Sequence, residues 1–183
     1  MAFLVAAVVL VGALCALDLI LTVGVIRRLR EHSDLIADIG GLGDAPVMAV
    51  GEEIPGFSAS TVNGTELSHK SLTEETLVAF FSPTCEPCKK KMPSFVEYAR
   101  AAERRGGRVV AAVVGDTELA EAFVSELAPV ADVVVEENTE GGISAAFKVS
   151  AFPTLLRVAP DRSGRLVVTS NDVELGGTVT AAA

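Results

Sequence analysis

The sequence predicts an α/β domain, built as a central mixed sheet with helices on both faces, behind one N-terminal transmembrane helix. Three observations predict this architecture. The first 26 residues are almost wholly apolar, short apolar runs alternate with helical patterns from residue 57 onward, and the pattern closes with a second hairpin. A length of 183 residues suits one membrane segment and one domain of ordinary size.

Residues 1–26 are expected to form a membrane anchor. Asp18 is the only charged side chain in this run, and a helix of about 25 residues rises about 37 Å, enough to cross a hydrocarbon core of about 30 Å. Secretory signals carry positive charge before the apolar stretch, whereas here the basic residues Arg27, Arg28 and Arg30 follow it. We therefore expect a single-pass anchor that is not cleaved.

Glycine and proline separate this anchor from the folded part. Residues 27–51 are expected to form a short juxtamembrane helix and then a Gly-rich linker. The domain is expected to span residues 52–170, and residues 171–183 form a short tail with little apolar surface. The net charge of −9 gives no basic face for a nucleic acid, so none is expected as a partner.

The first half of the domain is predicted from turn signals and apolar runs. Asn63-Gly64 is a hairpin turn signal between short strands at 57–62 and 65–67. Residues 77–81 form an apolar run without turn residues, which is typical of a buried central strand. A helical stretch then continues to about Arg105, where Gly106-Gly107 ends it.

The second half alternates strands with helices. Leu119, Phe123 and Leu127 share one helical face, which predicts a helix over 117–127. Such alternation predicts a mostly parallel sheet, with an antiparallel hairpin added at the end. The remaining expected elements are strands at 108–114, 132–135, 154–158 and 166–169 and a helix at 143–147.

The motif Cys85-Glu86-Pro87-Cys88 follows the buried strand and opens a helix. Backbone N–H groups and the helix dipole at a helix start favour a thiolate on Cys85, and the thiolate is the nucleophile of disulfide exchange. Cys88 lies about one turn inside, where it resolves the mixed disulfide. Pro87 stiffens the intervening turn. We predict that Cys85 and Cys88 are catalytic, without a cofactor or metal.

The charges beside the motif have opposite effects. Glu86 disfavours a thiolate, whereas Lys89, Lys90 and Lys91 favour it. The lysines either stabilise the thiolate and dock an acidic partner or form a solvated basic face. The direction of electron flow does not follow from these charges.

A zinc site or a structural disulfide accounts for the cysteine pair less well. A zinc site needs four ligands, and only Cys15, His32 and His69 could complete one. A purely structural disulfide across two residues closes too small a loop to stabilise the fold much.

A second segment supports the redox interpretation. Phe152-Pro153-Thr154 follows the predicted helix at 143–147 and leads into a strand, where a proline is tolerated at the entry. Together with Cys85-Glu86-Pro87-Cys88, it reproduces a known order of motifs.

From about Glu52 to Thr169 the chain resembles the TlpA-like branch of the thioredoxin superfamily, and the anchor resembles that of its MauD-type members. The resemblance rests on Ile54-Pro55-Gly56-Phe57, the strand with the cysteine motif, Pro93 and Phe152-Pro153-Thr154. It implies a thioredoxin-like fold, a cis Pro153 beside the sulfurs that shapes a substrate groove, protein thiol or disulfide substrates and a separate redox partner.

Two of the departures from relatives of this kind remove an acidic residue. A buried acid six positions before the first cysteine is replaced by Ala79, and a glutamate three residues after the motif is replaced by Lys91. A membrane-bound redox-sensing or accessory module with little turnover therefore stays as the alternative function. A peroxidase would need a threonine where Ser82 stands.

The side of the membrane is predicted differently by two features. The arginines after the anchor predict a cytoplasmic domain by the positive-inside rule. The resemblance implies an extracytoplasmic domain, which we expect, with the cytoplasmic side left open.

Overall fold

The computed structural model describes Val5, Gly12 and residues 48–175. Among these residues, no helix is both long enough and apolar enough to cross a membrane. Apart from Val5 and Gly12, the predicted anchor at 1–26 lies outside the described residues, as do most of the linker at 27–51 and the end of the tail.

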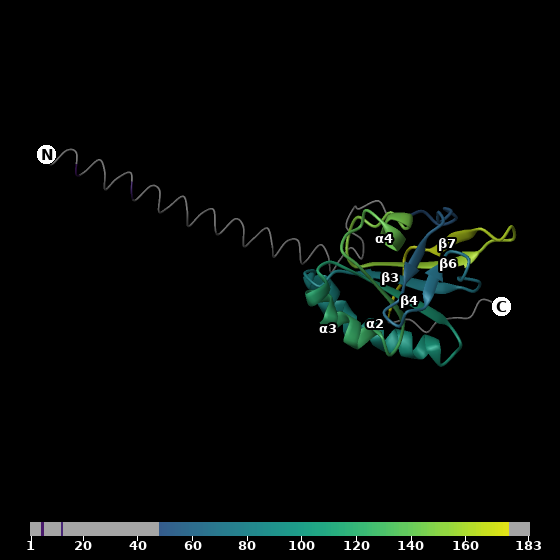
Figure 1. Ribbon diagram of the computed structural model, residues 1–183, viewed down its shortest axis with the longest axis horizontal. Helices are drawn as coiled ribbons and strands as arrows, with labels where there is room; N and C mark the ends of the chain where they lie inside the picture. The colour runs from purple at the N-terminus through teal and green to yellow at the C-terminus, as the bar shows by residue number, and fades with distance from the viewer. Residues whose placement is uncertain (1–4, 6–11, 13–47, 176–183) are drawn as a thin grey trace. The chain divides into compact units, whose positions relative to one another are not determined.

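A five-stranded mixed sheet forms the centre of the domain (Figure 1). Its strands, in spatial order, are β5 (Asp132–Glu136), β4 (Arg108–Val114), β3 (Thr76–Phe81), β6 (Thr154–Pro160) and β7 (Leu166–Ser170). β3 pairs in parallel with β4, as does β4 with β5, whereas β6 runs antiparallel to both β3 and β7. The predicted mixed sheet is confirmed, but the expectation that it is mostly parallel is wrong, because only two of the four pairings are parallel.

The connection between β5 and β6, residues 137–153, contains one short helix. α4 (Gly142–Ala146) has five residues, so it rises only about 7.5 Å. Returning along a strand of five residues requires about 17 Å. α4 alone does not carry the chain back along the sheet, and β6 begins opposite Phe80, near the end of β3, and runs antiparallel to it.

Helices cover both faces of the sheet, as the sequence predicts (Figure 1). α2 (Glu86–Glu103) and α3 (Thr117–Leu127) pack on one face, and α4 packs on the other. Side chains alternate along β3, so Ala79 and Phe81 join the core beneath α2 and α3, while Val78 and Phe80 join the core beneath α4.

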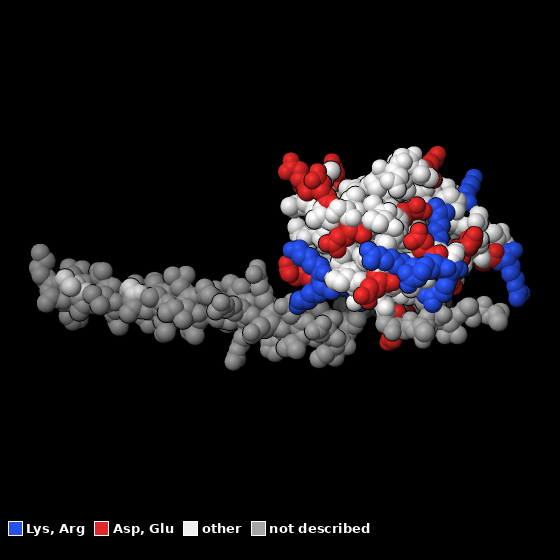
Figure 2. Space-filling model, turned by 90° about the horizontal axis from the view of Figure 1, so that it is seen from below, with Lys and Arg blue, Asp and Glu red and all other residues white. Residues whose placement is uncertain are grey.

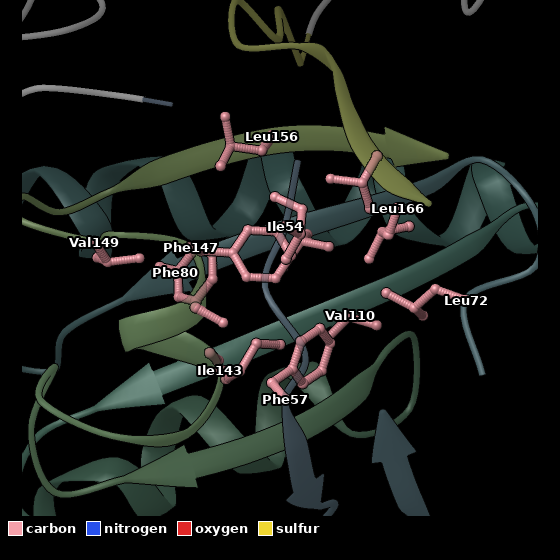
Figure 3. Close-up of a cluster of buried hydrophobic side chains, with 14 of the residues drawn as sticks. Ile54, Phe57, Leu72, Phe80, Val110, Ile143, Phe147, Val149, Leu156 and Leu166 are labelled. Atoms are coloured by element: carbon pink, nitrogen blue, oxygen red, sulfur yellow. The ribbon is translucent and has the colours of Figure 1, made fainter. Parts of the chain in front are cut away.

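Aromatic rings fix α4 against the sheet. Phe147, which directly follows α4, lies with its ring centroid 5.3 Å from that of Phe80 and 5.8 Å from that of Phe57. Figure 3 shows these side chains together with Ile143 and neighbouring aliphatic residues. The position of α4 is therefore determined on its sheet-facing side by close packing.

Both edges of the sheet are partly covered. β1 (Ser58–Ser60) and β2 (Glu66–Ser68) form the predicted hairpin, which adds a bridge from Thr61 to Val134 on β5. At the other edge the Gly51 N–H donates to Val168 O at 2.8 Å, and Met48 is buried. The packed chain thus starts before residue 52, and neither edge strand is left fully open to pairing with other molecules.

Candidate active site

Cys85 occupies the N-cap position of α2. Its Sγ accepts a hydrogen bond from the Cys88 backbone N–H at 3.3 Å, and its backbone is extended, as N-cap geometry requires. Pro87 lies in the first turn, where its missing N–H leaves no helical bond unmade. The sulfur of Cys85 is therefore placed among the N–H groups that stabilise negative charge at a helix start.

The two cysteines differ in exposure. Both are free thiols, with Cys85 half-buried and Cys88 buried at 0% exposure. Burial raises the pKa of the Cys88 thiol well above its usual range, and the neighbouring Cys85 sulfur raises it further. Cys88 is thus a protonated, sheltered thiol next to a more accessible one.

The segment at residues 151–154 completes the site. The Phe152–Pro153 peptide bond is cis, and Phe152 O accepts a hydrogen bond from the Cys85 thiol at 3.3 Å. Thr154 is buried, and its hydroxyl donates to Ala151 O at 2.8 Å. The antiparallel register between β3 and β6, with Phe80 opposite Thr154, brings this distant segment to the cysteine motif. The expected cis bond before Pro153 is therefore found, next to the Phe152 carbonyl that contacts Cys85.

The charged residues of the motif compensate each other. The Lys89 ammonium lies 2.7 Å from a Glu86 carboxylate oxygen, and this ion pair lowers the pKa of Glu86. Figure 2 looks at the side of the domain on which α2 and α3 lie, and it shows Lys and Arg interspersed with Asp and Glu. For Lys89, the structure therefore favours the interpretation as a solvated side chain, here paired with Glu86.

The position six residues before Cys85, where the resemblance implies a buried acid, is apolar in this chain. Ala79 is buried on β3 between Ala111 and Leu155, so its side chain offers no proton acceptor beneath the sulfurs. Within residues 48–175 no three side chains of His, Cys, Asp or Glu gather closely enough to hold a metal ion.

Sequence reasoning did not identify Gly115 as part of this region. Gly115 has a φ of +147°, and a Cβ on it would lie 3.2 Å from Cδ of Pro83, two residues before Cys85. Its N–H donates to Glu136 O at 2.8 Å. A glycine directly after a buried strand was the only available signal, and it did not reveal which loop the glycine contacts.

The comparisons with known proteins agree with this geometry. The model of the AhpC/TSA family matches residues 50–163. Thiol-disulfide oxidoreductase ResA from Bacillus cereus is 26% identical over 130 residues, which cover 70% of this chain and 73% of ResA. ResA from Bacillus subtilis (strain 168) is 27% identical over 126 residues, covering 68% and 69%.

A solved structure shows the same fold. The thioredoxin domain of a thiol-disulfide oxidoreductase from Bacteroides vulgatus aligns with a TM-score of 0.53 at 18% identity, covering 66% of this chain and 87% of that one. The predicted thioredoxin-like architecture is thereby confirmed for the described domain. The chain belongs to the AhpC/TSA family and is a thiol-disulfide oxidoreductase.

Proposed function

We propose that this chain is a membrane-tethered member of the TlpA-like branch, and that it exchanges disulfides with protein thiols through Cys85 and Cys88. One observation carries the assignment of the pair. Cys85 Sγ is the helix N-cap, 3.3 Å from both the Cys88 N–H nitrogen and Phe152 O, while Cys88 is fully buried beside it. The Cys85 sulfur can therefore attack a disulfide or be attacked by a thiol, whereas the Cys88 sulfur is sheltered from solvent.

In the reductive direction, the Cys85 thiolate attacks one sulfur of a substrate disulfide. That S–S bond breaks, a mixed disulfide forms, and the departing substrate sulfur takes up a proton. Cys88 then loses its proton and attacks Cys85 Sγ, which releases the second substrate thiol and leaves a Cys85–Cys88 disulfide. Two electrons pass to the substrate, and the same steps in reverse oxidise a substrate dithiol.

The cycle requires a second redox partner, because each turnover converts the dithiol into the disulfide. A protein that supplies or removes two electrons must restore the starting state. Phe152 and Pro153, both half-buried beside Cys85, form the wall against which the backbone of a substrate or partner would lie. Thr154 supports that wall from within β6 through its bond to Ala151 O.

Reduction of the insulin disulfides by dithiothreitol-recycled full-length protein tests the assignment. Wild type and a Cys15→Ser control should both turn over, whereas Cys85→Ser should be inactive. Equal turnover by Cys85→Ser and wild type would refute the catalytic role of Cys85. A wild type that reduces insulin once without further turnover would instead favour the redox-sensing or accessory module.

Tethering and sidedness form a separate part of the proposal. The apolar run at 1–26 supports a single-pass anchor, and the resemblance to anchored relatives supports an extracytoplasmic domain. A membrane-impermeant maleimide applied to intact cells should label Cys85. Labelling that occurs only after lysis would place the domain in the cytoplasm, as the arginines after the anchor predict.

A further inference from the structure

Glu136, at the end of β5, holds the start of α4. Gly141 occupies the N-cap position of α4 and provides no side-chain acceptor. The two Glu136 carboxylate oxygens accept from the Ile143 N–H at 2.8 Å and from the Ser144 N–H at 3.0 Å. A carboxylate from a neighbouring strand thus replaces the missing cap and lies at the positive end of the helix.

Gly142, the residue beside this contact, leaves room for the Glu136 carboxylate. Gly142 has a φ of +57°, and a Cβ on it would lie 1.9 Å from a Glu136 carboxylate oxygen. Only glycine gives both the left-handed backbone and the room for this carboxylate. The clamp between Glu136 and α4 therefore depends on a specific pair of residues.

The same residue contacts the cysteine side of the site through its backbone. Glu136 O accepts from the Gly115 N–H at 2.8 Å, and Gly115 packs against Pro83 in the loop that leads to Cys85. Glu136 is thus connected to the cysteine loop through its main chain and to α4 through its side chain.

The other end of α4 leads to Phe152 and Pro153. Lys148 adopts a φ of +51° and ends the helix, with the Val149 N–H donating to Ser144 O at 3.0 Å. Phe152 follows three residues after Val149, and its carbonyl oxygen lies 3.3 Å from Cys85 Sγ. Residues 147–151 alone thus separate α4 from the carbonyl that contacts Cys85.

We propose that Glu136 is a positioning residue for disulfide exchange, which clamps α4 and thereby holds the Phe152–Pro153 wall against Cys85. The effect on exchange rests on the proposed function of Cys85. Without the clamp, the wall moves away from the sulfur, so a protein substrate is aligned less well.

The test compares full-length Glu136→Gln and Glu136→Ala with Glu137→Gln, which removes a neighbouring exposed charge that makes no side-chain hydrogen bond or ion pair among the described residues. We expect the KM for insulin to rise about fivefold in Glu136→Ala, with kcat nearly unchanged. Alkylation of Cys85 by iodoacetamide at a fixed pH should become faster, because the Phe152–Pro153 wall no longer shields its sulfur, while Cys88 stays protected. Glu136→Gln retains one acceptor, so its KM and alkylation rate should lie between those of wild type and Glu136→Ala. Glu137→Gln should match wild type.

Two results would overturn the inference. If both Glu136 variants keep the KM and the Cys85 alkylation rate of Glu137→Gln, the carboxylate only stabilises the helix. If Cys88 becomes alkylated together with Cys85, the domain opens as a whole and positioning is not the cause. Should Glu136→Ala fail to fold, Glu136→Gln decides. Because alkylation needs no substrate, it tests the clamp even if Cys85 proves dispensable for insulin reduction.

Discussion

Replacing Gly142 with alanine would break the contact between Glu136 and α4 without touching either cysteine. The added Cβ would meet the carboxylate oxygen at 1.9 Å, which is far inside van der Waals contact. The Glu136 side chain can move away, but it then leaves the Ile143 and Ser144 N–H groups without an acceptor. Alanine must also adopt the left-handed backbone of Gly142.

The expected loss of stability follows from these terms. Two hydrogen bonds to a half-buried carboxylate contribute about 1 kcal/mol each. Placing alanine in the left-handed region costs about 1 kcal/mol more than placing glycine there. Gly142→Ala should therefore lower the free energy of unfolding by about 3 kcal/mol, equivalent to about 10 °C in Tm for a domain of this size.

Thermal and urea unfolding of the reduced protein would measure this loss. The matched control is Gly141→Ala, because a Cβ on Gly141 meets nothing within 4 Å and its φ is −134°. The control should change stability by less than about 0.5 kcal/mol. In a Glu136→Ala background, Gly142→Ala should cost only about 1 kcal/mol, which gives a coupling of about 2 kcal/mol. Equal losses in both backgrounds, or a harmless Gly142→Ala, would refute the clamp.

Three further predictions concern other sites. Cys88→Ser should accumulate a mixed disulfide between Cys85 and a substrate sulfur, seen as a mass increase on non-reducing analysis, and its absence would contradict the resolving role. Lys148→Gly should be about 1 kcal/mol more stable than Lys148→Ala in urea unfolding. Both variants lose the ion pair to Glu52, but only glycine relieves the left-handed backbone. The reverse order of stability would exclude backbone strain at this position. Hydrogen bonds within its turn lower the pKa of Asp161, so its stabilising effect is present near neutral pH and is lost as pH falls below about 4. Asp161→Asn should accordingly be less stable than wild type at pH 7 and should approach it at acid pH, whereas a constant difference would argue against this linkage.

The local elements were predictable because their signals lie within short stretches of sequence. Helix Thr117–Leu127 and strand Arg108–Val114 have the predicted bounds. The spacing of apolar residues in each segment fits either a helix or a strand but not both, and glycine or proline stands near the segment ends. Cys85 was placed at a helix start for the same reason, since a strand, a short loop and a helical pattern meet there.

Contacts between distant segments were harder to predict. The antiparallel direction of β6 comes from its pairing with β3, and no pattern within residues 143–158 indicates that pairing. Glu136 caps a helix that begins six residues later, and no local spacing rule describes a cap from a neighbouring strand. Contacts of this kind become visible only when the strands are assembled.

We propose that Cys85 reacts at the start of α2, while Cys88 stays a buried, protonated thiol beside it. Alkylation of the reduced full-length protein across pH, with each cysteine quantified by peptide mass spectrometry, tests this claim most directly. We expect rapid modification of Cys85 at neutral pH and protection of Cys88 until the solution is strongly alkaline. Modification of both at the same rate, or of neither at neutral pH, would contradict it.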